Sequence, residues 1–430
     1  MTDVFYRAPA LAYPTIARGE GIFLYDTAGR RYLDGASGAL VANLGHGRRE
    51  IAAAMAQQAE RVAFAHTMRF TSEAQEELAH RVAALLPYGL RHTYPVSGGS
   101  EATETAIKLS RQYFLETGEP RRFRVLARWA SYHGNSIGAL SASGHIGRRR
   151  PYEPLLSTAF QHFSSPDPTC PGPGEDGECG CTRALRAAIE GAGPETVAAI
   201  LLEPVGGSAN SGFVPHAGYM QAVRRIADEY GALLIADEVM TGFGRTGRVL
   251  GMEHFGVAPD LITAAKGLSG GYAPLGAVVA ADRVYEAVLS GSGRFAHGFT
   301  YGGHPVACAA GAKALEILER EGLVEHAARM GSSLRAGLEE LMGRHGAVRQ
   351  VRGLGLMQGL VLDQAARPGA RAARLSDLAF AEGLIVYPGS GGPDGLLGDH
   401  ILVAPPLTVT VAEIGELLGL LDRALSRLEE

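Results

Sequence analysis

The 430-residue chain has little of several features that would restrict its class. It contains four cysteines and one tryptophan, and its net charge is only −5. Four cysteines do not make a disulfide scaffold at this length. No apolar stretch could cross a bilayer, and Met1 to Ala10 has no apolar signal core. No basic run exceeds Arg148 to Arg150, which argues against a nucleic-acid or membrane partner. We therefore expect a cytoplasmic protein.

Hydrophobic residues make up 46% of the chain, enough for a large core in two domains or in one large domain. Strand-like and helical patterns alternate from about residue 90 to 310, as in a parallel sheet with crossover helices. We predict an α/β fold with a large domain at residues 56–318 and a smaller α+β domain at 319–430, to which residues 1–55 contribute. The strands expected in the large domain include Thr93 to Val96, Phe123 to Ala127, Val197 to Leu202, Leu233 to Ala236, Leu261 to Thr263 and Gly276 to Ala280.

Two of these strands end in side chains that suit covalent catalysis. The apolar run that begins at Leu233 ends in Asp237 and Glu238, and the run that begins at Leu261 ends in Lys266. Parallel strands place their ends at one rim of the sheet, where open α/β folds bind ligands. A lysine there can hold an aldehyde as a Schiff base, while an acid keeps a ring nitrogen protonated. The pair indicates a pyridoxal 5'-phosphate (PLP) enzyme.

A glycine-rich turn, Ser97-Gly98-Gly99-Ser100, lies between an expected strand and an expected helix. The free N–H groups of such a turn and the positive end of the helix dipole form a phosphate site. Taken alone, the turn could equally be an ordinary helix N-cap. Beside a PLP lysine, we interpret it as the phosphate site.

The residues around these anchors resemble a known family, the class III aminotransferases. The longest similar blocks run from Asp237 to Gly247 and from Ala265 to Ala277, and the resemblance extends from about Tyr25 to Pro406. It implies the PLP-dependent transferase fold of type I, with a large, mainly parallel seven-stranded-type sheet, and a homodimer or higher oligomer with shared active sites. Further blocks that match in order are Gly38 to His46, Ser97 to Ala102, Ser131 to Gly134, Glu203 to Val205 and Thr300 to Pro305.

The resemblance also assigns roles to single residues. It implies that Lys266 forms the Schiff base and that Asp237 pairs with the pyridine nitrogen. Tyr132 would stack on one face of the ring, and Val239 would cover the other. Thr300 would complete the phosphate site of the neighbouring chain. The cofactor-binding positions implied are Gly98, Gly99, Ser100, Tyr132, His133, Glu203, Asp237, Val239, Met240, Lys266 and Thr300.

The function implied is transfer of an amino group from an amine or amino acid to a keto acid. Class III racemases, aminomutases and decarboxylases share the same cofactor residues and remain alternatives. Outside this class, Gly267 to Gly271 fits the G-x-S-x-G pattern of a serine hydrolase, with Ser269 as nucleophile, but its glycines oppose the helix that this pattern needs. Gly242 to Gly247 fits G-x-G-x-x-G without the strand and helix context of a nucleotide site.

The residues that would bind the substrate do not match the pattern of the family. Many glutamate-using members carry an arginine where this chain has Leu402, and Glu203 matches the glutamate that often pairs with it. Amine:pyruvate members place an arginine before Gly-Asp-His, and the stretch from Gly392 to His400 has none. The choice between pyruvate and 2-oxoglutarate as acceptor therefore stays open.

Three of the cysteines, Cys170, Cys179 and Cys181, lie in a Pro/Gly-rich segment that is typical of a loop. Together with the nearby His162 they could offer four zinc ligands. Their spacing fits no standard zinc site, so we predict reduced thiols on a surface loop and no metal.

Overall fold

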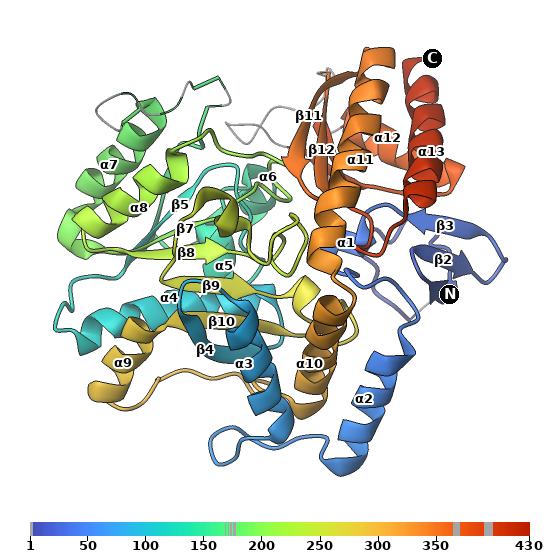
Figure 1. Ribbon diagram of the computed structural model, residues 1–430. Helices are drawn as coiled ribbons and strands as arrows, with labels where there is room; N and C mark the ends of the chain where they lie inside the picture. Colours follow the sequence, from blue (N-terminus) through green and yellow to red (C-terminus); the bar gives the residue numbers. More distant parts are fainter. Residues whose placement is uncertain are drawn as a thin grey trace.

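The computed structural model describes residues 3–167, 169–170, 172, 174, 178–363, 370–390 and 399–430. Its centre is a seven-stranded sheet with the order β4-β10-β9-β8-β7-β5-β6 (Figure 1). The five strands from β9 to β6 are parallel, and β10 alone runs antiparallel to both neighbours. This confirms the mainly parallel sheet predicted above. The strands are β4 (Leu90–Val96), β5 (Arg124–Arg128), β6 (Phe160–Phe163), β7 (Val197–Leu202), β8 (Leu233–Asp237), β9 (Leu261–Ala264) and β10 (Gly276–Ala281).

Helices cover both faces of this sheet, which explains its uninterrupted apolar strands. Along β8, Leu233 and Ile235 join the core under α4 (Gly99–Glu116) and α9 (Asp282–Ser290). The alternate residues Leu234 and Ala236 face the core that contains α7 (Gly180–Ala192) and α8 (Tyr219–Glu229). This period of two follows from the pleat of a strand. Two shorter helices, α5 (Ile137–Ala142) and α6 (Ile146–Arg149), follow β5.

The C-terminal part of the chain forms an α+β unit around two four-stranded sheets. One sheet joins the two ends of the chain, because β13 pairs in parallel with β3 through Leu384 and Leu33. Figure 1 shows the N-terminal strands beside α13. The strands between residues 16 and 34 thus pack with the C-terminal unit, although the exact domain boundaries stay a prediction. The first sheet has β1 (Ile16–Glu20), β2 (Phe23–Asp26), β3 (Arg31–Asp34) and β13 (Leu384–Ile385); the second has β11 (Val348–Leu354), β12 (Met357–Leu362), β14 (Tyr387–Ser390) and β15 (Asp399–Val403); the helices are α11 (Leu323–Arg344), α12 (Ala370–Glu382) and α13 (Val411–Glu429).

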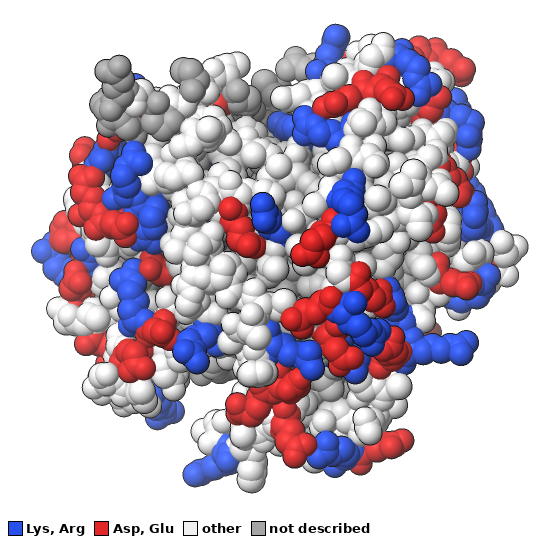
Figure 2. All heavy atoms as spheres, viewed as in Figure 1, with Lys and Arg blue, Asp and Glu red and all other residues white. Residues whose placement is uncertain are grey.

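A third group of helices lies at the lower edge of the molecule in Figure 1. There α10 (Pro305–Arg320) packs against α2 (Arg49–Arg61) and α3 (Glu73–Leu85). The short helix α1 (Ser37–Leu40) precedes them. On the face drawn in Figure 2, positive and negative side chains are interspersed. No helix in the described part of the chain is both long and apolar enough to cross a membrane.

Candidate active site

The site lies at the rim where the carboxyl ends of the large sheet's strands meet. Asp237 is the last residue of β8, and Lys266 follows the end of β9. Both side chains line one cavity of about 180 Å³. Because β4 and β9 are each antiparallel to β10, they run in the same direction, and α4 therefore begins at this rim too. The predicted cofactor-binding residues that also line the cavity are Gly99, Ser100, Tyr132, His133, Glu203, Val239 and Met240.

The Asp237 carboxylate is buried and firmly oriented. Its Oδ1 accepts hydrogen bonds from the Val239 amide and the Thr263 hydroxyl, each at 3.1 Å. Its Oδ2 lies 2.7 Å from Nδ1 of His133, whose Nε2 is buried without a protein partner. A carboxylate that is only 4% exposed needs such partners to offset its desolvation. The sequence pattern did not identify the contribution of Thr263.

The neighbouring acid, Glu238, plays a different part. It accepts hydrogen bonds from the amides of Gly251 and Met252, at 2.8 and 2.9 Å, and from the Thr241 hydroxyl. Burial raises the pKa of Glu238 to about 7. Of the two adjacent acids, only Asp237 reaches the cavity, and Glu238 organises the loop behind it.

Lys266 occupies an unusual backbone position. Its φ of +45° lies in the left-handed region, where a residue with a side chain is strained and where functional residues are often found. Burial lowers the pKa of Lys266 to about 8, although the carboxylates of Asp237 and Glu203 act in the opposite direction. A lysine with this pKa is partly neutral near physiological pH and can act as a nucleophile or a base.

The start of α4 forms a cradle for an anion. Gly99 is the first residue of this 18-residue helix, and Gly99 and Ser100 both line the cavity. A Cβ atom at Gly99 would approach the Val239 side chain to 3.1 Å, so glycine keeps this end of the cavity open. Free N–H groups and the helix dipole favour a phosphate there.

The two residues predicted to contact the cofactor ring lie in the walls of the cavity. Tyr132 and Val239 both line it, and the Tyr132 amide donates a 3.4 Å hydrogen bond to Oε2 of Glu203. The other Glu203 oxygen accepts from the Gly207 amide at 3.1 Å, and burial raises the pKa of Glu203. Glu203 therefore ties together two loops of the site.

These residues fit a flat, anionic cofactor such as PLP. The cavity combines a helix N-terminus for a phosphate, a buried acid bonded to the His133 imidazole, and a lysine of lowered pKa. Two of the predicted residues do not line it. Gly98 precedes α4 and Thr300 is exposed on a turn.

A wider, basic groove of about 540 Å³ adjoins the cavity, and the motifs gave no sign of it. Its wall includes Arg7, His145 and Arg148. The Arg148 guanidinium lies 4.6 Å from the centre of the Tyr132 ring, and its Nη2 is 3.4 Å from the Tyr387 hydroxyl. Among the described residues no carboxylate pairs with Arg148. The only available signal was its place in the Arg148 to Arg150 run. Residues 392–398, part of the stretch compared above with amine:pyruvate members, lie outside the described residues.

The two motif alternatives do not form sites. The Ser269 hydroxyl is buried and donates to the Ala273 carbonyl at 2.7 Å, so the hydrolase interpretation is not supported. The G-x-G-x-x-G segment positions Arg245, which is fully buried and joins the two parts of the molecule. Its guanidinium donates to the carbonyls of Leu356 and Pro405 and to the Asn43 side chain, at 3.0, 2.6 and 2.6 Å.

The prediction of thiols on a surface loop was wrong. Cys179 directly precedes α7, and Cys181 lies in its first turn. Both side chains are buried because they face the core beneath that helix. His162 does not belong to their cluster. It stacks on Trp129 at 4.3 Å and bonds to the Ala142 carbonyl. Its place is taken by His216, which is distant in the sequence.

Comparison with known proteins agrees with this geometry. The family model "Aminotransferase class-III" matches residues 7–425. The chain is 37% identical to diaminobutyrate–2-oxoglutarate transaminase of Halomonas elongata, covering 96% of this chain and 90% of the relative. It is 35% identical to beta-alanine–pyruvate aminotransferase of Pseudomonas aeruginosa, covering 79% and 77%. The solved structure of a PLP-bound amine transaminase from an uncultivated Pseudomonas species superposes with a TM-score of 0.91, at 35% identity and 99% coverage of both chains.

Proposed function

This chain belongs to the class-III aminotransferases, and we propose that Lys266 is the residue to which its cofactor, PLP, is covalently attached. The enzyme transfers an amino group from an amine donor to a keto acid. PLP supplies an aldehyde that condenses with amines and a pyridinium ring that withdraws electrons from the substrate carbon. The single observation that carries the assignment is the convergence of Lys266, with its lowered pKa, and buried Asp237 on one cavity.

The chain's own residues then have the following parts. The Lys266 amino group, when it is free, would move a proton to and from the substrate carbon. The Asp237 carboxylate, oriented by His133 and Thr263, holds a proton at the ring nitrogen. The N–H groups at Gly99 and Ser100 bind the phosphate, while Tyr132 and Val239 exclude water from the ring faces. We assign Glu203 a positioning role through Tyr132.

Trapping the covalent link tests the lysine directly. Borohydride reduction of the holoenzyme should attach the cofactor to the peptide that contains Lys266, as mass spectrometry would show. Lys266→Ala should fold, bind PLP without a reducible link and lose turnover by roughly 10⁵-fold or more, because both the nucleophile and the base are gone. A reducible link that persists in Lys266→Ala would refute the assignment.

We further propose that Arg148 binds the carboxylate of the keto acid. Two relatives are named for 2-oxoglutarate and pyruvate, and each of these acceptors has a carboxylate next to its carbonyl carbon. Arg148 borders the cavity across the Tyr132 ring and lacks a carboxylate partner within the described chain. An arginine can bind a carboxylate with two parallel hydrogen bonds. This position replaces the arginine that the sequence lacks at Leu402.

The working unit that we propose is a homodimer with shared sites. Thr300 is exposed and lies outside its own chain's cavity, as expected of a residue that serves a second copy. Next to it, Tyr301 is 62% exposed and lies 6.1 Å, centre to centre, from the partly exposed Phe64 ring. Met68 and Phe70, which follow Phe64 closely in the sequence, are also exposed, at 75% and 66%. A second copy that packs here would bury these side chains.

Mixed dimers provide the test. Lys266→Ala and Thr300→Ala should each be strongly impaired alone. A dimer with one subunit of each kind has one site with both native residues, so activity should return to about one quarter of the wild-type value if subunits mix at random. Verified mixed dimers without recovery, or an active monomer by sedimentation, would contradict the shared site.

A further inference from the structure

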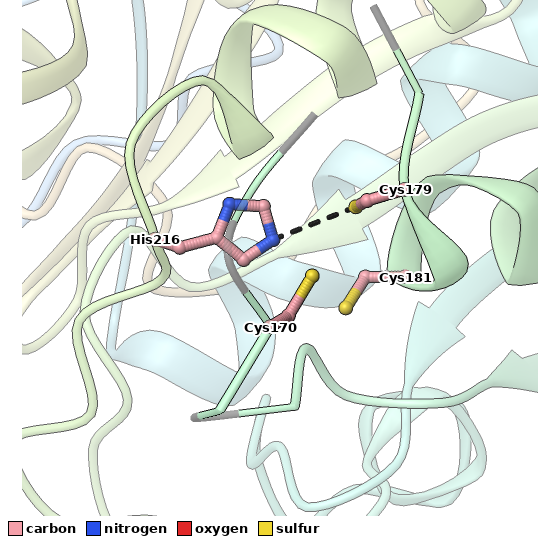
Figure 3. A group of neighbouring side chains, drawn as sticks. All are labelled: Cys170, Cys179, Cys181 and His216. Carbon is pink, nitrogen blue, oxygen red and sulfur yellow. Dashed lines mark hydrogen bonds between the residues drawn. The ribbon is translucent and has the colours of Figure 1, made fainter. Parts of the chain in front are cut away.

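A cluster of three cysteines and one histidine lies away from the proposed active site, beside the helices α7 and α8. The ligand atoms of Cys170, Cys179, Cys181 and His216 all lie within 4.8 Å of one another, and Figure 3 shows their side chains pointing toward a common centre. We propose that this cluster binds one zinc ion, which ties the segment at Cys170, the start of α7 and the segment before α8 together.

The distances suit tetrahedral coordination. With Zn–S bonds of about 2.3 Å and Zn–N bonds of about 2.0 Å, two ligand atoms of a tetrahedral site lie roughly 3.5–3.8 Å apart. The Cys179 Sγ atom is 3.6 Å from Nε2 of His216. Three soft thiolates and one imidazole form a ligand set that selects zinc over calcium or magnesium.

The histidine is already oriented as a ligand. Nδ1 of His216 lies 3.1 Å from the Ala217 carbonyl, to which it can donate only if it carries the proton. Nε2, on the side of the cysteines, then keeps its lone pair for a metal. The edge of the His216 ring also meets the Tyr219 ring, with the centroids 5.5 Å apart.

Polar groups of the backbone contact two of the sulfur atoms. The Asp167 amide donates to Cys181 Sγ at 3.3 Å, and the Thr182 amide caps the Cys179 side chain at the start of α7. These contacts fix the positions of both sulfur atoms. Each thiol releases its proton to solvent when it binds the metal.

A disulfide explains the cluster less well. It would use two of the three sulfur atoms and leave the buried third thiol and the oriented histidine without a function.

Metal content and a cobalt spectrum test the proposal without any measurement of activity. The holoenzyme, expressed with zinc and dialysed against zinc-free buffer, should contain about one zinc per chain. Replacement by Co²⁺ should give the intense visible and near-ultraviolet bands of tetrahedral cobalt with thiolate ligands. Cys181→Ser and His216→Ala should lose most of the metal, whereas Cys308→Ser, which changes a buried thiol outside the cluster, should keep it.

The outcomes separate the alternatives. The PLP absorption of each variant reports whether the large domain has folded. If Cys181→Ser and His216→Ala do not fold, zinc released from the wild type by a mercurial thiol reagent, measured with a chromophoric chelator, replaces them as the readout. A reduced wild-type chain that takes up no zinc, a mass 2 Da lower that marks a disulfide, or equal zinc content in wild type and His216→Ala would each overturn the proposal.

Discussion

The cavity around Lys266 and the basic groove around Arg148 adjoin each other across Tyr132, yet they are built differently. The cavity is small, about 180 Å³, and its polar groups stand at the ends of strands in one sheet. The groove, about 540 Å³, is lined by Arg7 from the N-terminal segment, by the α6 region, and by Pro388 and Gly389 from β14. The residues that we propose for cofactor chemistry thus lie at the rim of the large sheet. The residues that we propose for substrate binding lie where separate parts of the chain meet.

This difference has a consequence for how each region responds to change. Residues at strand ends are held by buried neighbours, so a substitution there removes a group that nothing else can replace. Residues of the groove come from several separate segments, and Arg148 is only partly buried, so water and neighbouring side chains can compensate in part. We therefore expect large losses of rate in the cavity and moderate losses of affinity in the groove.

Among tests that compare the cavity with the groove, we expect the largest effect for Asp237→Asn, a substitution in the cavity. The variant should still bind PLP but lose turnover by roughly 10³-fold or more, because a neutral amide does not hold the ring proton. Glu238→Gln makes the same change at the next residue, outside the cavity, and serves as the matched control. Steady-state kinetics and PLP absorption measure both variants. Near-normal turnover by Asp237→Asn, or an equal loss in Glu238→Gln, would contradict the role of Asp237.

A smaller effect is expected for Arg148→Ala. The KM for the keto acid should rise by roughly 10- to 100-fold, which corresponds to the loss of a charge-assisted hydrogen-bond pair. The half-reaction with an amine that has no carboxylate should change by less than about threefold. Arg150→Ala removes the same charge from an exposed position nearby and is the control. Equal effects on both half-reactions would mean that Arg148 only supports Tyr132.

The sequence predicted the cavity better than the groove for a physical reason. Asp237 and Lys266 end apolar strands, and parallel strands bring their ends together whatever the rest of the chain does. The antiparallel strand β10 does not change where the parallel strands end. His216 and Arg148 were missed because their partners are set by loop packing, which has no local pattern. The same holds for Arg245, whose buried bonds to Asn43 and Pro405 join segments far apart in the chain.

The smallest expected effect concerns pH and the first step of holoenzyme formation. Since burial lowers the pKa of Lys266 to about 8, the neutral amine that attacks the aldehyde should increase about tenfold between pH 7 and pH 9 and then level off. A lysine with its ordinary pKa of about 10.4 would instead give a rise of nearly 100-fold over this range, without a plateau.

The free energy of unfolding should depend on pH with the same sign. Because the folded chain binds fewer protons at Lys266 than the unfolded chain does between the two pKa values, this residue makes stability rise with pH there. The rate at which PLP becomes covalently attached to apoenzyme, followed by absorption in stopped flow, measures the first effect. A rate that still rises about sevenfold from pH 9 to pH 10, as for a lysine with its ordinary pKa, would show that the cavity does not lower the pKa of Lys266. The contrast between a desolvated cavity and a hydrated groove would then fail.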